Sequence, residues 1–390
     1  IYTGLDFWSP NINIFRDPRW GRGHETYGED PYLTGELAVQ FIKGMQGNHP
    51  KYLKTIATAK HFAVHSGPEA LRHGFDVDVS DQDLYETYLP AFKKSVTEGK
   101  VYSFMSAYNR FRGVPASGST FLLQKVLRED WGFEGYVVSD CSAIGDIYNN
   151  HKVAASKEEA AAIGLTGGCD LNCGSYYLNL GAAEKSGLVS SEDIDRALKR
   201  LLIARFKLGM FDDPEGVPFA NIPYDIICSD ANNALARKAA QESMVLLKNE
   251  GNLLPLDKQK IKSIALIGPN ADNWESLVGN YHGTPKNPVT FLKGIQNKVS
   301  PLIKVLYAEG SHLDAKHLNL KPIPSIFLST KDGRQGLDAF YYNNTNWEGE
   351  PILVKTDDKI DFWWEHRPIN DLLRDNFSVT WEGFLLPPAT

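Results

Sequence analysis

The sequence predicts an α/β protein, and three patterns along its 390 residues support this fold class. Residues 1–211 alternate short apolar runs with amphipathic stretches, as parallel βα units do. A linker at 212–230 combines prolines, glycine and acidic residues without periodicity, and a second α/β region at 231–317 follows it. Over 318–390 short runs alternate apolar and polar residues, which predicts an all-β segment.

Five apolar runs of the first region are predicted to be strands, and nearly every one ends in polar or charged residues. The runs are 7–15, 55–62, 101–108, 135–140 and 169–172. Helices are predicted at 32–46, 80–98, 119–130, 157–166 and 190–208. Ser190 and Asp193 have the spacing of a helix capping box. Because parallel strands end at one edge of a sheet, the polar strand ends are expected to build a site.

The later regions carry weaker patterns. A helix is predicted at 231–248 and a buried parallel strand at 263–268. Short strands separated by turns with Asn, Asp and Gly are predicted at 336–342, 351–354, 361–364 and 378–384. That spacing is typical of part of a β-sandwich.

Composition limits the partners of the protein. Hydrophobic residues make up 42% and charged residues 23%, as in ordinary globular proteins. The net charge is −7 and no basic run stands out, so no nucleic acid is expected as a partner. No apolar stretch reaches membrane-spanning length, so no membrane span is expected. The chain begins at Ile1 without Met, and we interpret it as a fragment in which no signal peptide can be read.

The run from Val137 to Cys141 is the most informative stretch. Val137 and Val138 are β-branched and predict a buried strand, which stops at a hydroxyl, a carboxylate and a thiol. A strand end delivers a reactive side chain rigidly, so Asp140 is our candidate nucleophile. The alternative is that Asp140 caps the following helix.

The other strand ends add cations and a tyrosine. The set contains Arg16, Arg19, Arg22, Lys60, His61, His65, Glu69, Arg72, His73, Met105, Tyr108, Asn109 and Asp170. One carboxylate among several cations suits a neutral substrate with many hydroxyls, and the cations should lower the pKa of the carboxylate. An ionised carboxylate is what a glycosyl nucleophile must be. Structural alternatives are a buried ion-pairing role for Lys60 and His61, a core role for Tyr108, a structural loop role for His65, and surface ion pairs for the arginines.

The four cysteines leave alternatives open. Cys169 and Cys173 have a spacing that suits a metal, but no clear histidine pair accompanies them, so we expect no metal. A disulfide from Cys141 to Cys173 or to Cys169 would need an oxidising compartment. Buried free thiols are the other interpretation.

Five segments strongly resemble glycoside hydrolase family 3, and they occur in the order found in that family. They are NINIFRDPRWGRGHETYGEDP at 11–31, KHFAVHSGPE from Lys60, SAYN from Ser106, VVSDC ending at Cys141, and ESMVLLKNEGNLLPL from Glu242. The resemblance implies a (β/α)8-type barrel, here N-terminally truncated, followed by an α/β sandwich domain. The tail from Asp332 resembles the start of a PA14-like β-sandwich, which some members carry as an insertion.

The resemblance also implies roles for individual residues. Asp140 aligns with the catalytic nucleophile of a retaining glycosidase. The residues that align with the sugar-binding subsite are Arg22, Lys60, His61 and Tyr108, with Arg72 and Met105 at the same site. The second carboxylate, the acid/base residue, is expected beyond residue 390, and Glu275 and Glu309 fit no motif for it. No cofactor and no metal are implied.

The residue after the nucleophile suggests the substrate. Many glucosidases of the family have Trp there, whereas Cys141 resembles the β-xylosidase and arabinofuranosidase branch, in which Cys173 is the expected disulfide partner. A bridge in that space would exclude the exocyclic group of glucose by clash. We therefore expect an exo-β-xylosidase, periplasmic or secreted, acting on glycosides or oligosaccharides. The alternatives are a β-glucosidase or an inactive sugar-binding homologue. The loop after Lys60 lacks the pattern of the family's N-acetylhexosaminidases.

Overall fold

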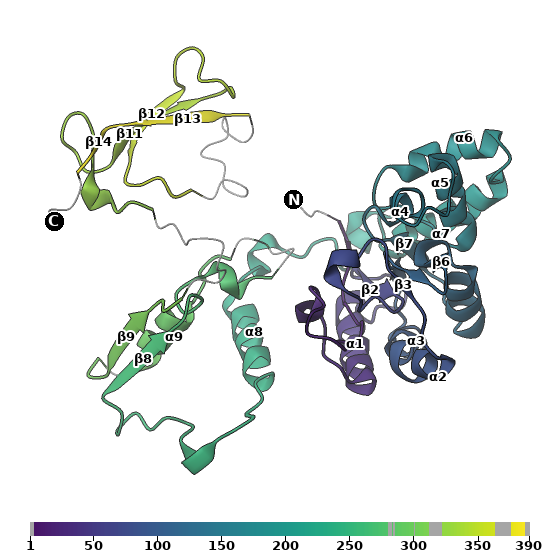
Figure 1. Cartoon of the computed structure of the whole chain (residues 1–390), viewed down its shortest axis with the longest axis horizontal. Coiled ribbons are helices and arrows are strands. Elements are labelled where there is room, and N and C mark those ends of the chain that lie inside the picture. The colour runs from purple at the N-terminus through teal and green to yellow at the C-terminus, as the bar shows by residue number, and fades with distance from the viewer. Residues whose placement is uncertain are drawn as a thin grey trace. The chain divides into compact units, whose positions relative to one another are not determined.

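The chain forms two compact units in the computed structural model, Ile1–Pro223 and Tyr224–Thr390 (Figure 1). The structure describes residues 4–279, 283, 285–299, 301–311, 322–362 and 376–386. The boundary between the units falls inside the predicted linker at 212–230. The division of the chain into four regions remains a prediction.

The first unit is organised around a parallel sheet. Its strands lie in the order β1 (Asp6–Phe7), β2 (Ile56–Phe62), β4 (Ser103–Ser106) and β7 (Tyr136–Ser139). Lys60 pairs with Met105, and Met105 pairs with Val138, so these three side chains share one face. The predicted strand at 169–172 reduces to a single parallel bridge between Leu171 and Val138. Three short strands form a second sheet, β3 (Asp76–Val77), β5 (Arg110–Phe111) and β6 (Val114–Pro115).

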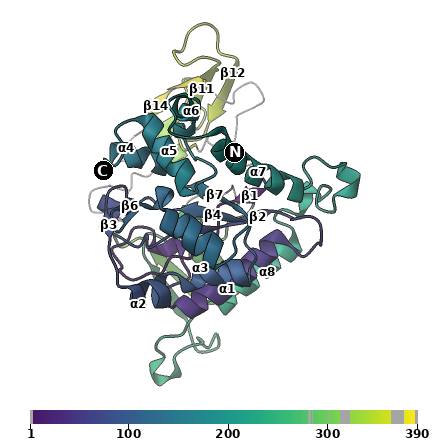
Figure 2. The same ribbon diagram turned by 90° about the vertical axis from the view of Figure 1, so that its right-hand side faces the viewer.

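Helices surround the parallel sheet. They are α1 (Pro31–Gln46), α2 (Asp81–Asp83), α3 (Pro90–Thr97), α4 (Ala143–Asn149), α5 (Lys157–Gly167), α6 (Leu180–Lys185) and α7 (Ser191–Lys207), with π-helical segments at Leu84–Tyr88 and Phe121–Asp130. Figure 2 shows α1 and α3 side by side next to the strands. Between β2, β4 and α3, the rings of Phe62, Phe92 and Phe104 form the aromatic core, with Phe62 in edge contact with both others.

The predicted helices of the first unit are confirmed, but its first strand is shorter than predicted. Ser190 accepts from the Asp193 backbone N–H, and Asp193 accepts from the Ser190 backbone N–H, so the capping box of α7 is present. Of the predicted strand at 7–15, only β1 and a bridge at Asn11 exist. Pro10 has no N–H for the ladder, and Asn11 accepts the backbone N–H of Asn13 instead. Both α4 and α6 are absent from the sequence prediction.

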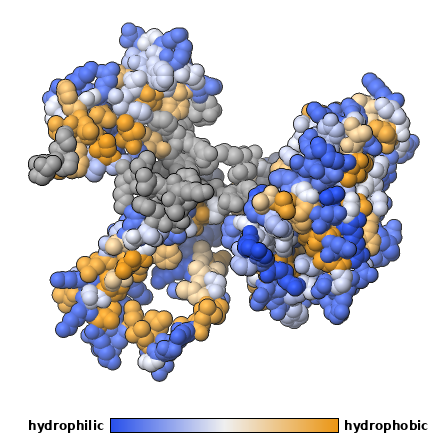
Figure 3. Space-filling model, viewed as in Figure 1, coloured by the Kyte–Doolittle hydropathy of each residue, from blue (hydrophilic) through white to orange (hydrophobic). Residues whose placement is uncertain are grey.

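The second unit begins with an α/β part. It contains α8 (Asp230–Glu242), β8 (Ser263–Ile267), α9 (Phe291–Lys298) and β9 (Lys304–Ala308), and β8 pairs with β9 in parallel. The predicted helix at 231–248 stops at Glu242, because the consecutive apolar run 244–247 does not make a one-sided helical stripe. Apolar side chains gather on the surface of this part in the view of Figure 3, and Leu247 is 92% exposed.

The rest of the second unit is antiparallel. β11 (Leu337–Tyr342) lies between β12 (Leu353–Asp357) and β13 (Ser378–Glu382), and β10 (Leu328–Ser329) pairs with β14 (Phe384–Leu385). Ala339 and Tyr341 form its buried centre. Of the predicted strand at 361–364, the last two residues lie outside the described residues, and the first two are not in a strand.

Short 3₁₀ turns connect these elements. They lie at Gly23–Glu25, Glu69–Leu71, Ala116–Gly118, Tyr176–Asn179, Pro214–Gly216, Tyr224–Ile226, Glu250–Asn252, Glu275–Leu277 and Ser325–Phe327. Among the helices that the structure describes, none has the length and apolar character needed to cross a bilayer.

Candidate active site

Asp140 stands at the carboxyl end of the buried strand β7. Tyr136, Val137 and Val138 favour a strand by their branched or aromatic side chains, and every residue of β7 is buried. Asp140 follows directly and is 6% exposed. Its Oδ1 accepts the backbone N–H of Cys141 at 2.8 Å. The N-cap of α4 is Ser142, without a side-chain capping bond, so the helix-capping alternative for Asp140 is wrong.

Two nitrogen groups face the other carboxylate oxygen of Asp140. Arg22 Nη1 and His61 Nε2 each lie 3.4 Å from Asp140 Oδ2. Glu25 holds the Arg22 guanidinium with two hydrogen bonds. Arg22 Nε donates to Glu25 Oε1 at 2.8 Å, and Arg22 Nη2 donates to Glu25 Oε2 at 3.0 Å. Lys60, at the end of β2, is also buried and contributes a positive charge to the field at Asp140. The structure thus brings together four of the predicted site residues.

Burial decides the protonation behaviour of this cluster. It raises the pKa of Asp140 above its usual range, and it does so against the opposing effect of Arg22, the largest of the groups that favour the ionised form. Sequence reasoning expected a lowered pKa for Asp140, and that direction is wrong, because desolvation outweighs the cations. Burial also lowers the pKa of Lys60 and holds that of His61 well below its usual value, so His61 is neutral.

Neighbouring side chains orient the histidines and Arg22, and among them Asn13 is the one that the sequence analysis did not single out. The ion pair predicted for the arginines exists between Arg22 and Glu25, but it is buried and not on the surface. Asn13 donates Nδ2 to the carbonyl of His61 at 2.9 Å and accepts its backbone N–H at 2.8 Å. Glu25 holds Arg22, as described above. A signal for Asn13 was available, because it lies in the same segment as Arg22. His65 pairs through Nδ1 with Asn109 Oδ1 at 3.3 Å, and burial lowers its pKa to about 3.

Tyr108 comes from the loop after β4, and its hydroxyl is one of the groups that favour the ionised form of Asp140 and oppose the rise of its pKa. It is buried, and burial together with the Asp140 charge raises its pKa far above the usual value. Arg72 lies in the loop after β2 and forms an ion pair with Glu69. Met105 is fully buried beneath the site and packs with Val138 and other residues of the strands and of α7.

Several other candidates lie outside this cluster. Asp170 forms ion pairs with Arg128 at 2.8 Å and Arg200 at 2.7 Å, so it is a structural residue between helices. Arg19 pairs with Asp17 and its side chain is 88% exposed. Of the three arginines in the first segment, Arg22 is the one that reaches Asp140.

A disulfide adjoins the candidate nucleophile. Cys141 is joined to Cys173, with the two Cα atoms 4.5 Å apart. Ser142 N–H donates to the Cys173 carbonyl at 2.8 Å, and the Cys173 N–H donates to Ser139 Oγ at 3.0 Å. The loop of Cys173 is therefore tied to the end of β7 by covalent and hydrogen bonds. Cys169 is a buried free thiol, so the alternative pairing with Cys141 is not formed.

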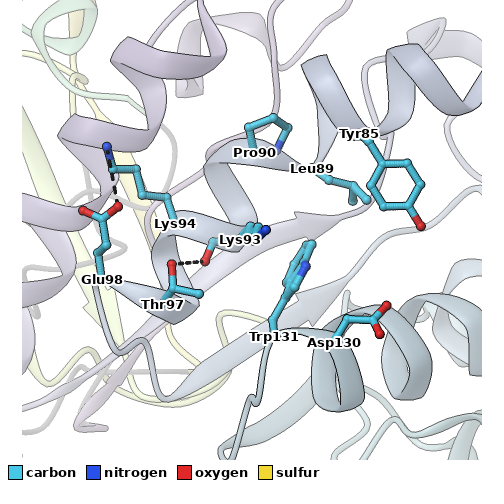
Figure 4. Close-up of a pocket in the computed structure, with 9 residues that line it drawn as sticks. All are labelled: Tyr85, Leu89, Pro90, Lys93, Lys94, Thr97, Glu98, Asp130 and Trp131. Atoms are coloured by element: carbon cyan, nitrogen blue, oxygen red, sulfur yellow. Dashed lines mark hydrogen bonds and ion pairs between the residues drawn. The ribbon is translucent and has the colours of Figure 1, made fainter.

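A metal site and a second groove are the two alternatives to a site at Asp140. In the part of the chain that the structure describes, no group of His, Cys, Asp and Glu could hold a metal ion. A groove on the outer helices is lined by residues of Leu84–Tyr88 and α3 and by Asp130 and Trp131 (Figure 4), and it contains none of the predicted site residues.

This arrangement is chemically able to support attack by the Asp140 carboxylate on an electrophilic carbon. A rigid strand holds Asp140, backbone and side-chain donors face both of its oxygens, and burial makes its negative charge less stable than in water. Such a carboxylate is a competent nucleophile once ionised. The surrounding donors are suited to hydroxyl groups of a neutral ligand.

Comparisons with known proteins point to one family. Residues 1–204 match the glycosyl hydrolase family 3 N-terminal domain, and residues 244–362 match the C-terminal domain of that family. The chain is 45% identical to a xylan 1,4-β-xylosidase of Xylanibacter ruminicola, over 90% of this chain and 41% of that protein. It thus spans less than half the length of this curated relative.

Two solved structures are similar to the chain. One is an exo-β-xylosidase of the same family in complex with a xylobiose aziridine probe, with a TM-score of 0.75 and 38% identity. The other is a β-glucosidase from Erythrobacter marinus, with a TM-score of 0.73 and 37% identity. Each comparison covers 80% of this chain and 41% of the other chain.

Proposed function

Because the chain belongs to glycosyl hydrolase family 3, we propose that the protein is a retaining exo-β-glycosidase acting on β-D-xylosides of xylo-oligosaccharides. In this family a TIM-barrel-like domain is followed by an α/β sandwich domain. The observation that carries the proposal is Asp140 itself, a buried carboxylate at the end of β7 with Arg22 and His61 facing it.

The proposed reaction has two steps. An oxygen of Asp140 attacks the anomeric carbon, a covalent glycosyl-enzyme forms, and the bond to the leaving oxygen breaks as a second carboxylic acid protonates it. Water then attacks the same carbon and releases Asp140. In retaining enzymes the two carboxyl groups lie roughly 5–5.5 Å apart. We assign no residue of this chain to the proton donor.

The neighbours of Asp140 are proposed to hold the sugar. Arg22 and Lys60 are proposed to donate to ring hydroxyls, and neutral His61, whose Nδ1 donates to Asn13 Oδ1, can accept through Nε2. Arg72 and Tyr108 would close the same subsite, with Met105 beneath it. None of these roles needs a metal or a cofactor.

The substrate class is inferred from the disulfide. Cys141 directly follows the proposed nucleophile, and it is bridged to Cys173. Xylose lacks the exocyclic CH₂OH group of glucose, so a rigid bridge in that space would reject glucosides by clash. The similarity to proteins described as xylosidases supports this choice.

A β-glucosidase is the second candidate. The similarity to the Erythrobacter marinus enzyme favours it, because that structure is nearly as close to the chain as the xylosidase structure is. A catalytically inactive sugar-binding protein is the third. We further propose that the chain works in the periplasm or outside the cell, where a disulfide persists, and that 318–390 is the start of a PA14-like segment.

Two assays test the proposal. The full-length protein is incubated with nitrophenyl β-xyloside and nitrophenyl β-glucoside, and we expect faster release from the xyloside. A fluorosugar xyloside with a dinitrophenyl leaving group is then used to trap the intermediate, and peptide mass mapping should find the label on Asp140. Equal or faster release from the glucoside would favour the β-glucosidase. Sugar binding without release would favour the inactive sugar-binding protein. A label on another residue would remove Asp140 from its role.

A further inference from the structure

A histidine and an aspartate outside the proposed sugar-binding set join the loops around the nucleophile. His73 lies in the loop after β2, and Asp146 lies in the first turn of α4, six residues after Asp140. His73 Nδ1 and Asp146 Oδ2 are 2.9 Å apart. The Asp146 side chain is 5% exposed and also accepts Asn150 Nδ2 at 2.5 Å, so its position is fixed.

The ring of His73 packs against Tyr108. Their centroids are 4.4 Å apart and their planes are inclined by 60°, an edge contact. His65 approaches the same tyrosine ring at 5.9 Å. The Tyr108 ring therefore has histidine rings as neighbours from the loop after β2, while its hydroxyl is one of the groups that favour the ionised form of Asp140.

We propose that His73, held by Asp146, is a positioning residue that fixes the Tyr108 ring and with it the hydroxyl that acts on Asp140. The inference rests on the proposed function, in which Asp140 is the nucleophile. The loops that follow β2 and β4 supply His73 and Tyr108, and α4, the helix after β7, supplies Asp146. The backbone N–H of Ala143 donates to the Asp140 carbonyl at 3.0 Å, so α4 and the nucleophile are tied to each other.

The contact has a consequence for catalysis because Tyr108 opposes the effect of burial on Asp140. A hydrogen bond to the charged form of a carboxylate favours that form. The charged or titratable groups that act on Asp140 are Arg22, Lys60, His61 and Tyr108. If the Tyr108 ring is free to turn, its interaction with Asp140 is weakened. Asp140 then ionises at a higher pH.

The test is the rate at which the dinitrophenyl fluorosugar xyloside labels Asp140. Dinitrophenolate leaves without a proton, so the assay reports nucleophile and positioning rather than the acid. His73→Phe keeps a ring and removes the bond to Asp146, whereas Asp146→Asn removes the acceptor charge. His49→Phe is the matched control, because His49 packs on Tyr52 outside the site.

We expect both site variants to lower the first-order labelling rate about tenfold, the loss that one well-made hydrogen bond represents. The half-saturating concentration of the fluorosugar should stay within about twofold, because the variants lose the orientation of Tyr108 and not a contact with the sugar. The acidic limb of the pH profile of the labelling rate should move to higher pH. Adding His73→Phe to Tyr108→Phe should change the rate less than about twofold, because coupled residues are not additive. The melting temperature of each variant is measured alongside.

Each result decides the matter. Unchanged labelling and pH profile in His73→Phe and Asp146→Asn would overturn the inference, and so would an additive effect on top of Tyr108→Phe. A raised half-saturating concentration at an unchanged rate would mean that His73 binds the sugar directly, which also overturns it. If instead the unmodified protein is never labelled at Asp140, the proposed function fails first.

Discussion

At the scale of single residues, the burial of Asp140 sets the ionisation that the proposed activity needs against the stability of the fold. Burial raises the pKa of Asp140, so the folded protein binds that proton more tightly than the unfolded chain does. Ionisation of Asp140 as the pH rises through its folded pKa therefore costs stability. The proposed reaction needs an ionised carboxylate at this position, so the loss of stability accompanies the proposed activity.

We predict that Asp140→Asn abolishes turnover and leaves the melting temperature equal or higher at neutral pH, because the amide removes a buried charge while keeping the size of the side chain. Differential scanning fluorimetry and the nitrophenyl assay check the two parts. An active variant would refute the nucleophile assignment, and a large drop in melting temperature would refute the account of its burial.

The raised pKa of Asp140 also predicts a pH profile. Only the ionised carboxylate attacks, so the labelling rate should fall as the pH drops through the folded pKa of Asp140, which lies above the ordinary value for an aspartate. The rate is measured between mildly acidic and neutral pH with the dinitrophenyl fluorosugar. An acidic limb at or below the ordinary aspartate value would contradict this prediction.

At the scale of elements, sequence patterns predicted what local chemistry dictates. The capping box at Ser190 and the strand that ends before Asp140 were read directly from residue types. Contacts across loops were not predictable, since His73 and Asp146 are 73 residues apart and meet only when the sheet forms. The direction of the Asp140 pKa was missed for a related reason. The motifs of a sequence indicate which cations accompany the carboxylate, but they do not show how deeply the fold buries it.

The α7 capping box offers a test of stability. Ser190→Ala should destabilise the protein by about 1 kcal/mol, because it leaves the first-turn N–H groups of α7 without their side-chain acceptor. Chemical unfolding monitored by circular dichroism gives the value. Ser191→Ala, one residue further and outside the cap, is the matched control and should change little. Equal effects of the two substitutions would argue against the cap.

The disulfide loop offers a test of selectivity. Cys173→Ser should raise activity on nitrophenyl β-glucoside relative to the xyloside, because the loop can then move away from the space that the bridge occupies. Cys228→Ser, at a free cysteine of the second unit, is the control. A xyloside-to-glucoside ratio that does not change in Cys173→Ser would show that the bridge does not set the sugar preference.

At the scale of the whole molecule, the four cysteines make a countable prediction. Cys169 and Cys228 are free, whereas Cys141 and Cys173 are bonded. Unfolded protein treated with a thiol reagent should therefore show two reactive thiols before reduction and four after it. Free thiols at both Cys141 and Cys173 in protein isolated from its native compartment would contradict the proposed oxidising location.

The bond between Cys141 and Cys173 has a practical consequence for anyone who produces this protein. If the bridge sets the sugar preference as proposed, expression in a reducing cytoplasm or purification with dithiothreitol would yield molecules of identical sequence whose sugar preference differs with the oxidation state of these two cysteines. Two laboratories could then publish different preferences for the same polypeptide, and both would be correct for the batch in hand.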